Sequence, residues 1–154
     1  MINYGKKFEE RFKLDWTNSI EDSCIIRLYD NTSGYLSISN ISDFICYKQP
    51  NIFFIECKSH KGASIPFDDI SQYNKLIQVA GIPGVRAGIV LWLYEKDKVF
   101  YVPVKTIKEL KEIGEKSVGL RHLEKYDIIE IPSKKLRVFM ESDYSILLSL
   151  PEGS

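Results

Sequence analysis

Ile52-Phe53-Phe54-Ile55-Glu56-Cys57-Lys58 is an apolar run that ends in two charged residues. Four consecutive apolar residues favour a β-strand in the protein interior. Alternation along a strand puts Glu56 and Lys58 on the same face, while Cys57 points the other way, into the core. Buried charge is costly unless the groups pair or bind an ion. The run therefore predicts an interior strand that carries a carboxylate and an amine at its end.

A second carboxylate, Asp43, begins the preceding strand, which we expect over Asp43–Lys48. The turn signal Gln49-Pro50-Asn51 joins this strand to the next one, Asn51–Lys58, so the two are predicted to form an antiparallel hairpin. In such a hairpin residues 43 and 56 lie near the same end. Their carboxylates can therefore converge.

These groups have the chemistry of a metal site that hydrolyses phosphodiesters. Asp43 and Glu56, with the main-chain carbonyl of Cys57, supply hard oxygen ligands that suit Mg²⁺, for which Mn²⁺ can substitute. Lys58 would then lie beside a metal-bound water. The ion lowers the pKa of the attacking water, and the lysine orients that water or stabilises the transition state. The sequence thus predicts a magnesium-dependent nuclease site with Asp43, Glu56 and Lys58 as its catalytic residues.

A simpler alternative is that Glu56 and Lys58 form a surface ion pair and that Asp43 is an ordinary turn residue. An isolated Glu-x-Lys favours this alternative, because so short a motif occurs often by chance. The hairpin context, the apolar strand and the flanking helices favour the nuclease.

Apolar periodicity predicts further elements on both sides of the hairpin. Phe8, Phe12 and Trp16 recur every four residues and indicate an amphipathic helix over residues 3–19, with Asn3 as its cap. This order predicts an α/β fold, a mixed sheet of about five strands flanked by helices, in one domain over residues 1–154. The remaining expectations are strands at Cys24–Tyr29, Val85–Tyr94 and Val99–Val104, helices at Phe67–Ala80 and Thr106–Lys116, a polar loop at Asp30–Asn40, and small edge strands at Asp127–Ile131 and Lys135–Met140.

The composition limits the possible partners. Lysine plus arginine and aspartate plus glutamate each total 21, so the formal net charge is zero. This balance argues mildly against a nucleic-acid binder, although a charged face depends on arrangement and not on the total. No apolar stretch approaches the roughly 18 residues that cross a bilayer, so we expect a cytoplasmic protein with no membrane partner. The cysteines lie in apolar runs and are expected to be reduced core residues: Cys24, Cys46 and Cys57.

Other residues are weaker candidates for the site. Glu9 lies on the first predicted helix and could turn toward the sheet as a third acidic group, with Glu10 as its rival. The polar segment after Lys58 contains His60 and Lys61 and could hold a phosphate backbone, or it could be a simple connector. The chain has only two histidines, so no zinc site is expected.

Four segments together resemble the RecU-type Holliday junction resolvases of the PD-(D/E)xK nuclease superfamily. They are Gly5-Lys6-Lys7-Phe8-Glu9, Ile41-Ser42-Asp43-Phe44, Phe54-Ile55-Glu56-Cys57-Lys58, and Ile65-Pro66-Phe67-Asp68-Asp69-Ile70-Ser71-Gln72-Tyr73-Asn74. The resemblance covers residues 4 to about 104 and suggests a short, phage-borne version in a bacterial host cell.

The resemblance implies a restriction-endonuclease-like fold and a homodimer that cuts four-way DNA junctions with Mg²⁺. It also implies that Glu9, Asp43 and Glu56 bind the metal and that Lys58 assists the water. Lys6 in the first segment and the pair His60 and Lys61 are expected to contact DNA.

The chain departs from the family pattern at two places. The family has a glutamine late in its last motif, where this chain has Asn74, with Gln72 two residues earlier, so either could contact DNA or water. The family's stalk, which enters the junction, would be short here because only Asn31–Asn40 is available. Two alternatives remain: a nuclease of the same fold that acts on other branched or duplex DNA, and a non-catalytic DNA-binding module of recombination.

Overall fold

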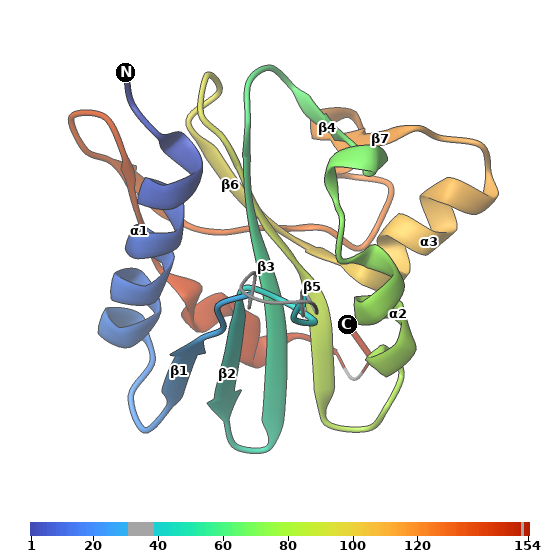
Figure 1. Ribbon diagram of the computed structural model, residues 1–154, viewed down its shortest axis with the longest axis horizontal. Coiled ribbons are helices and arrows are strands. Elements are labelled where there is room, and N and C mark those ends of the chain that lie inside the picture. The colour runs from blue at the N-terminus through green and yellow to red at the C-terminus, as the bar shows by residue number, and fades with distance from the viewer. Residues whose placement is uncertain (31–38, 152) are drawn as a thin grey trace, which may run out of the picture.

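A six-stranded mixed sheet forms the centre of the protein (Figure 1). The structure is a computed structural model that describes residues 1–30, 39–151 and 153–154. Within these residues the strand order is β1-β2-β3-β5-β6-β8. The strands are β1 (Cys24–Arg27), β2 (Phe44–Lys48), β3 (Asn51–His60), β5 (Val85–Leu93), β6 (Lys98–Pro103) and β8 (Ile129–Glu130).

The pairing of the strands confirms the predicted mixed sheet. β2 and β3 are antiparallel, with Phe44 opposite Ile55, and the turn between them contains a cis bond at Gln49–Pro50. β5 and β6 form the second predicted hairpin, and β3 pairs with β5 in parallel. The sixth strand, β8, pairs Glu130 with Phe100 at the edge of the sheet, where a small edge strand was expected.

Helix α1 (Tyr4–Ser19) covers one face of the sheet, as predicted. The Asn3 side chain accepts a hydrogen bond from the Lys6 amide at 3.1 Å and so caps the helix. Phe8, Phe12 and Trp16 are buried. The Phe12 ring centroid lies 5.2 Å from that of Phe44. This aromatic stripe fixes α1 against the strands that carry the site.

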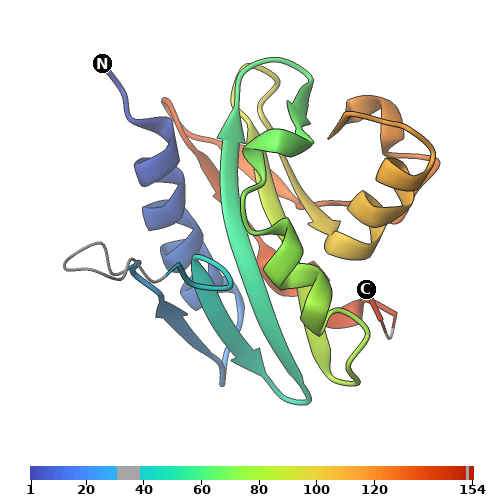
Figure 2. The same ribbon diagram turned by 45° about the vertical axis from the view of Figure 1, so that its right-hand side comes forward.

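The opposite face packs against α2 (Tyr73–Val79) and α3 (Val104–Glu112) (Figure 2). Alternation along β5 divides the core between the two faces. Val90 and Trp92 belong to the cluster under α1, whereas Ile89 and Leu91 belong to the cluster that includes residues of α3.

The second predicted helix begins later than expected. Ser64–Pro66 forms a short strand, β4, and Phe67–Asp69 forms a 3₁₀ turn, η1, so the prediction of helix from Phe67 is wrong. β4 pairs with β7 (Ser117–Gly119), a strand that was not predicted. The two strands approach closely, because a Cβ on Gly119 would lie 2.1 Å from the Ala63 carbonyl oxygen. This long-range pairing outweighs the helical spacing of the local sequence.

The C-terminal part also differs from expectation. The expected strand Lys135–Met140 is instead a small hairpin of β9 (Ser133–Lys135) and β10 (Met140–Ser142). Two further 3₁₀ turns are η2 (Leu120–His122) and η3 (Tyr144–Ser149). Residues 31–38, most of the expected stalk, lie outside the described part of the chain. No helix in the described residues is long and apolar enough to cross a membrane.

We expect Phe12→Ala to lower the free energy of unfolding by about 3–5 kcal/mol, because it leaves a cavity between α1 and the sheet. The control is Leu14→Ala on the same helix, where the side chain is 47% exposed and the loss should stay under about 0.5 kcal/mol. Urea unfolding followed by tryptophan fluorescence measures both. Equal losses in the two variants would contradict this packing of α1.

Candidate active site

The β2–β3 hairpin brings Asp43 and Glu56 together. Asp43 immediately precedes β2, and Glu56 follows Ile55, the partner of Phe44 in the register. One Asp43 oxygen, Oδ2, accepts a hydrogen bond from the Cys57 amide at 2.8 Å. Asp43 therefore lies against the part of β3 that carries Glu56.

The environment of Glu56 favours its protonated form. Its side chain is only 4% exposed, and burial together with a hydrogen bond to Asp43 and the charge of Asp43 raises its pKa to about 9. Lys58 opposes this rise in the pKa of Glu56. At neutral pH two adjacent carboxylates thus hold a proton between them, which relieves their repulsion.

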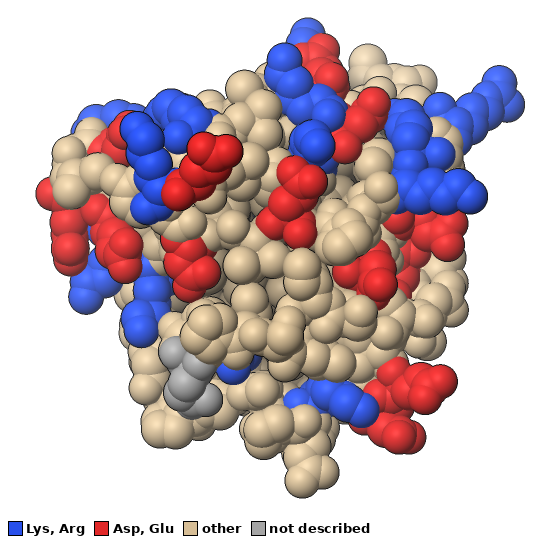
Figure 3. Space-filling model, turned by 180° about the vertical axis from the view of Figure 1, so that it is seen from behind, with Lys and Arg blue, Asp and Glu red and all other residues tan. Residues whose placement is uncertain are grey.

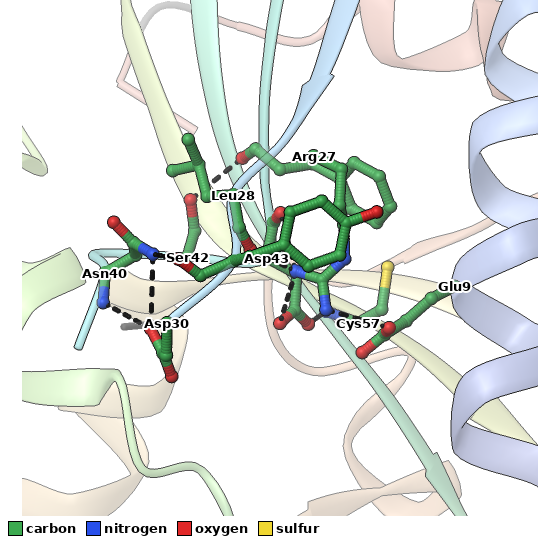
Figure 4. A network of polar contacts seen from close by, with 10 residues as sticks. Glu9, Arg27, Leu28, Asp30, Asn40, Ser42, Asp43 and Cys57 are labelled. Carbon is green, nitrogen blue, oxygen red and sulfur yellow. Dashed lines mark hydrogen bonds and ion pairs between the residues drawn. The ribbon is translucent and has the colours of Figure 1, made fainter. Parts of the chain in front are cut away.

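Arg27 is a site residue that sequence analysis missed. It ends β1, and Nη1 donates to the Asp43 main-chain oxygen at 2.9 Å and lies 3.3 Å from Asp43 Oδ1. Nη2 donates to Glu9 Oε2 at 3.0 Å. Figure 4 shows Glu9 reaching from α1 toward this guanidinium, with Asp43 on its other side. The one sequence signal was a charged residue directly after the apolar run Cys24-Ile25-Ile26.

The structure distinguishes Glu9 from its rival on the same helix. Glu9 is half-buried beside Arg27, and burial and the charge of Asp43 raise its pKa while Arg27 lowers it. Glu10 points outward, is 53% exposed and pairs with Lys7 at 3.4 Å. Glu9 is therefore the acidic group of α1 that belongs to this cluster.

Lys58 lies close enough to Glu56 and Glu9 to act on the charge of both. Its charge lowers the pKa of Glu56 and of Glu9. Among the described residues Lys58 forms no ion pair and donates no side-chain hydrogen bond, and it is half-buried. Its ammonium group is thus available to a ligand at this end of β3.

The donor groups fit a hard divalent cation. Asp43 and Glu56 are adjacent carboxylates, and a cation could replace the proton that they now share. In the described residues, however, no group of three His, Cys, Asp or Glu side chains is arranged to hold one ion. The Cys57 side chain points into the core, where burial raises the pKa of its thiol, so only its main-chain oxygen could serve.

The expected DNA-contacting residues are dispersed around the cluster. Exposed Lys6 lines a pocket of about 160 Å³ together with Glu9, Arg27 and others. His60 Nε2 lies 3.5 Å from Asp69, and its Nδ1 donates to the Lys61 carbonyl at 2.6 Å. Lys61 is exposed.

The structure gives no contact that separates Gln72 from Asn74. Gln72 precedes α2 and is half-buried, whereas Asn74 lies in α2 and is exposed. In the described part of the chain neither side chain bonds to Asp43 or Glu56.

Figure 3 views the molecule from behind, where basic and acidic side chains alternate over one half of the surface. This face therefore carries no continuous basic track for a phosphate backbone.

Comparison with known proteins finds a solved structure of similar fold. No protein-family model and no curated protein matches it. Among solved structures it is similar to Hjc of Archaeoglobus fulgidus, a Holliday junction resolvase from an archaeal hyperthermophile, with a TM-score of 0.56 and 17% sequence identity. The similarity covers 79% of this chain and 93% of that one. The predicted fold class is thus confirmed: a mixed sheet flanked by helices, as in that resolvase.

Proposed function

We propose that the protein is a metal-dependent endonuclease that hydrolyses DNA phosphodiester bonds at four-way junctions, in recombination and repair. The observation that carries this proposal is the hairpin that sets Asp43 beside Glu56, with Lys58 two residues further along β3. The similarity of the fold to an archaeal Holliday junction resolvase supports it. An ordinary surface ion pair would not need a buried carboxylate next to a second one.

Asp43, Glu56 and the main-chain oxygen of Cys57 would hold Mg²⁺ or Mn²⁺. When bound, the ion supplies Lewis-acid chemistry, which offsets negative charge on the phosphate and makes water a better nucleophile. Glu56 releases its proton on binding, because the ligand form is the carboxylate. Lys58 orients the attacking water, or donates to a phosphate oxygen as negative charge develops there.

The proposed substrate and assembly are those that the resemblance of the sequence to RecU-type resolvases implies. Lys6, His60 and Lys61, with Gln72 or Asn74, would contact the DNA backbone around the cluster. A homodimer would present two such sites to the two strands of a symmetric junction. We infer that the protein acts in the cytoplasm of a bacterial host cell, as a phage-borne resolvase of the RecU type would.

Removal of either carboxylate should abolish cleavage. We expect Asp43→Asn and Glu56→Gln each to slow nicking of a labelled four-way junction by at least about 100-fold, because the ion loses a ligand. Junction binding in a gel-shift assay should persist. Glu10→Gln, on the outward side of α1, should cleave like the wild type. Absence of nicking by the wild type with both Mg²⁺ and Mn²⁺ would falsify the catalytic proposal.

Junction and linear duplex of identical sequence should be cut at different rates. We expect the junction to be preferred by at least about tenfold, a difference of about 1.4 kcal/mol in transition-state binding. Single-turnover rates with Mg²⁺ measure the ratio. A preference for linear duplex would reassign the substrate while leaving the nuclease in place.

The stability of the metal-free protein should fall as the pH rises. Burial and Asp43 raise the pKa of Glu56 from 4.5 to about 9, so the folded state binds a proton that the unfolded state has already lost. The stability from this group is complete below pH 4.5 and is lost as the pH rises toward about 9.

Thermal unfolding in EDTA at pH 5, 7 and 9 measures this dependence. The Tm of the wild type should decline more steeply than that of Glu56→Gln, which has no proton to lose. Mg²⁺ should restore the wild type at high pH. Parallel pH profiles of the two proteins would contradict the assignment of the proton to Glu56.

A further inference from the structure

The guanidinium of Arg27 occupies the space between Asp43, a proposed metal ligand, and Glu9, a ligand only by the family resemblance. Nη2 donates to Glu9 Oε2 at 3.0 Å, and Nη1 lies 3.3 Å from Asp43 Oδ1. A Mg²⁺ shared by these two carboxylates would need oxygens about 2.1 Å away on each side. The guanidinium and a shared ion therefore cannot hold the same place.

Hydrogen bonds and ring contacts also fix the guanidinium of Arg27 in this position. Nη1 donates to the main-chain oxygens of Leu28, at 2.6 Å, and of Asp43, at 2.9 Å. The guanidinium carbon lies 5.0 Å from the Tyr29 ring centroid and 5.3 Å from that of Phe44. The side chain is 20% exposed. These contacts join the end of β1 to the start of β2, so displacement of Arg27 would undo part of the sheet edge.

The charges around the cluster can balance without Glu9 as a metal ligand. Arg27 pairs with Glu9 at 3.0 Å and lies 3.3 Å from Asp43 Oδ1. A divalent cation would balance Asp43 and Glu56, and Lys58 would remain as the positive group that faces a phosphate. If Glu9 bound the ion instead, Arg27 would lose the closer of its two ion-pair partners, which is unfavourable for a partly buried charge.

We propose that Glu9 is a positioning residue and not a metal ligand: it holds Arg27, and Arg27 fixes Asp43 for an ion bound by Asp43, Glu56 and the Cys57 main-chain oxygen. This inference rests on the proposed function. It departs from the ligand role that the family resemblance implies for Glu9. The absence of a three-residue ligand group in the described residues supports it.

A double-mutant cycle on the full chain tests the proposal, with Glu9→Gln, Arg27→Lys and the two combined. The readout is Mn²⁺ affinity without DNA, measured by electron paramagnetic resonance. We expect each single change to weaken binding by about tenfold or less, as for a supporting group, and the double variant to bind no more weakly than Arg27→Lys. Asp43→Asn should lose much more affinity. Glu10→Gln, the adjacent glutamate, should match the wild type.

A ligand role for Glu9 gives the opposite pattern. Glu9→Gln would then lower Mn²⁺ affinity as much as Asp43→Asn, and by the same factor in the Arg27→Lys background. That result overturns the proposal. If the Arg27 variants do not fold, the comparison of Glu9→Gln with Asp43→Asn still decides between the two roles.

Thermal unfolding with and without Mn²⁺ gives a second readout. Saturating Mn²⁺ should raise the Tm of Glu9→Gln nearly as far as that of Glu10→Gln, because the ion keeps its ligands. A rise that is lost in Glu9→Gln, as in Asp43→Asn, would refute the positioning role. Cleavage distinguishes the two proposals: a wild type that binds Mn²⁺ with the expected coupling but does not nick DNA refutes only the proposed function. A wild type that does not bind Mn²⁺ refutes both.

Discussion

The hydrogen bond from the Cys57 amide to Asp43 Oδ2, 2.8 Å long, joins the two strands on which the candidate site depends. It forms because β2 and β3 pair in a register that sets Phe44 against Ile55. A shift of one residue would turn every side chain of one strand to the other face. The large aromatic side chains under α1 prevent such a shift, since Phe44 and Phe53 fill that core. The apolar core thus determines where the carboxylates meet.

The buried position of Glu56 has an electrostatic consequence. Ile55 and Cys57 point into the core under α1, whereas Glu56 and Phe54 point to the other side of the sheet. Glu56 is therefore deeply buried without a direct cationic partner among the described residues, and its raised pKa reflects this. Two adjacent carboxylates, one of them buried, lower the stability of the folded protein, because their charges repel each other. The same pair is well suited to bind a cation, since a bound cation relieves this repulsion.

Local patterns predicted most of the central elements. Phe8, Phe12 and Trp16 specified the buried side of α1, and the turn at Pro50 specified the hairpin of β2 and β3. Local patterns did not predict β4, because its partner β7 lies some fifty residues away along the chain. Short strands of this kind have little periodicity, and their pairing depends on contacts that no local window contains.

The amino-acid order alone specified which face of each strand is buried, because side-chain alternation is a property of the extended backbone. Together with the turn at Pro50, it also specified that Asp43 and Glu56 lie at the same end of one hairpin. Only the tertiary structure decided that Arg27 lies between Glu9 and Asp43. These three residues come from α1, the end of β1 and the start of β2. Their contact depends on how the helix packs across the sheet, and side-chain packing between elements is not encoded in the spacing of any one of them.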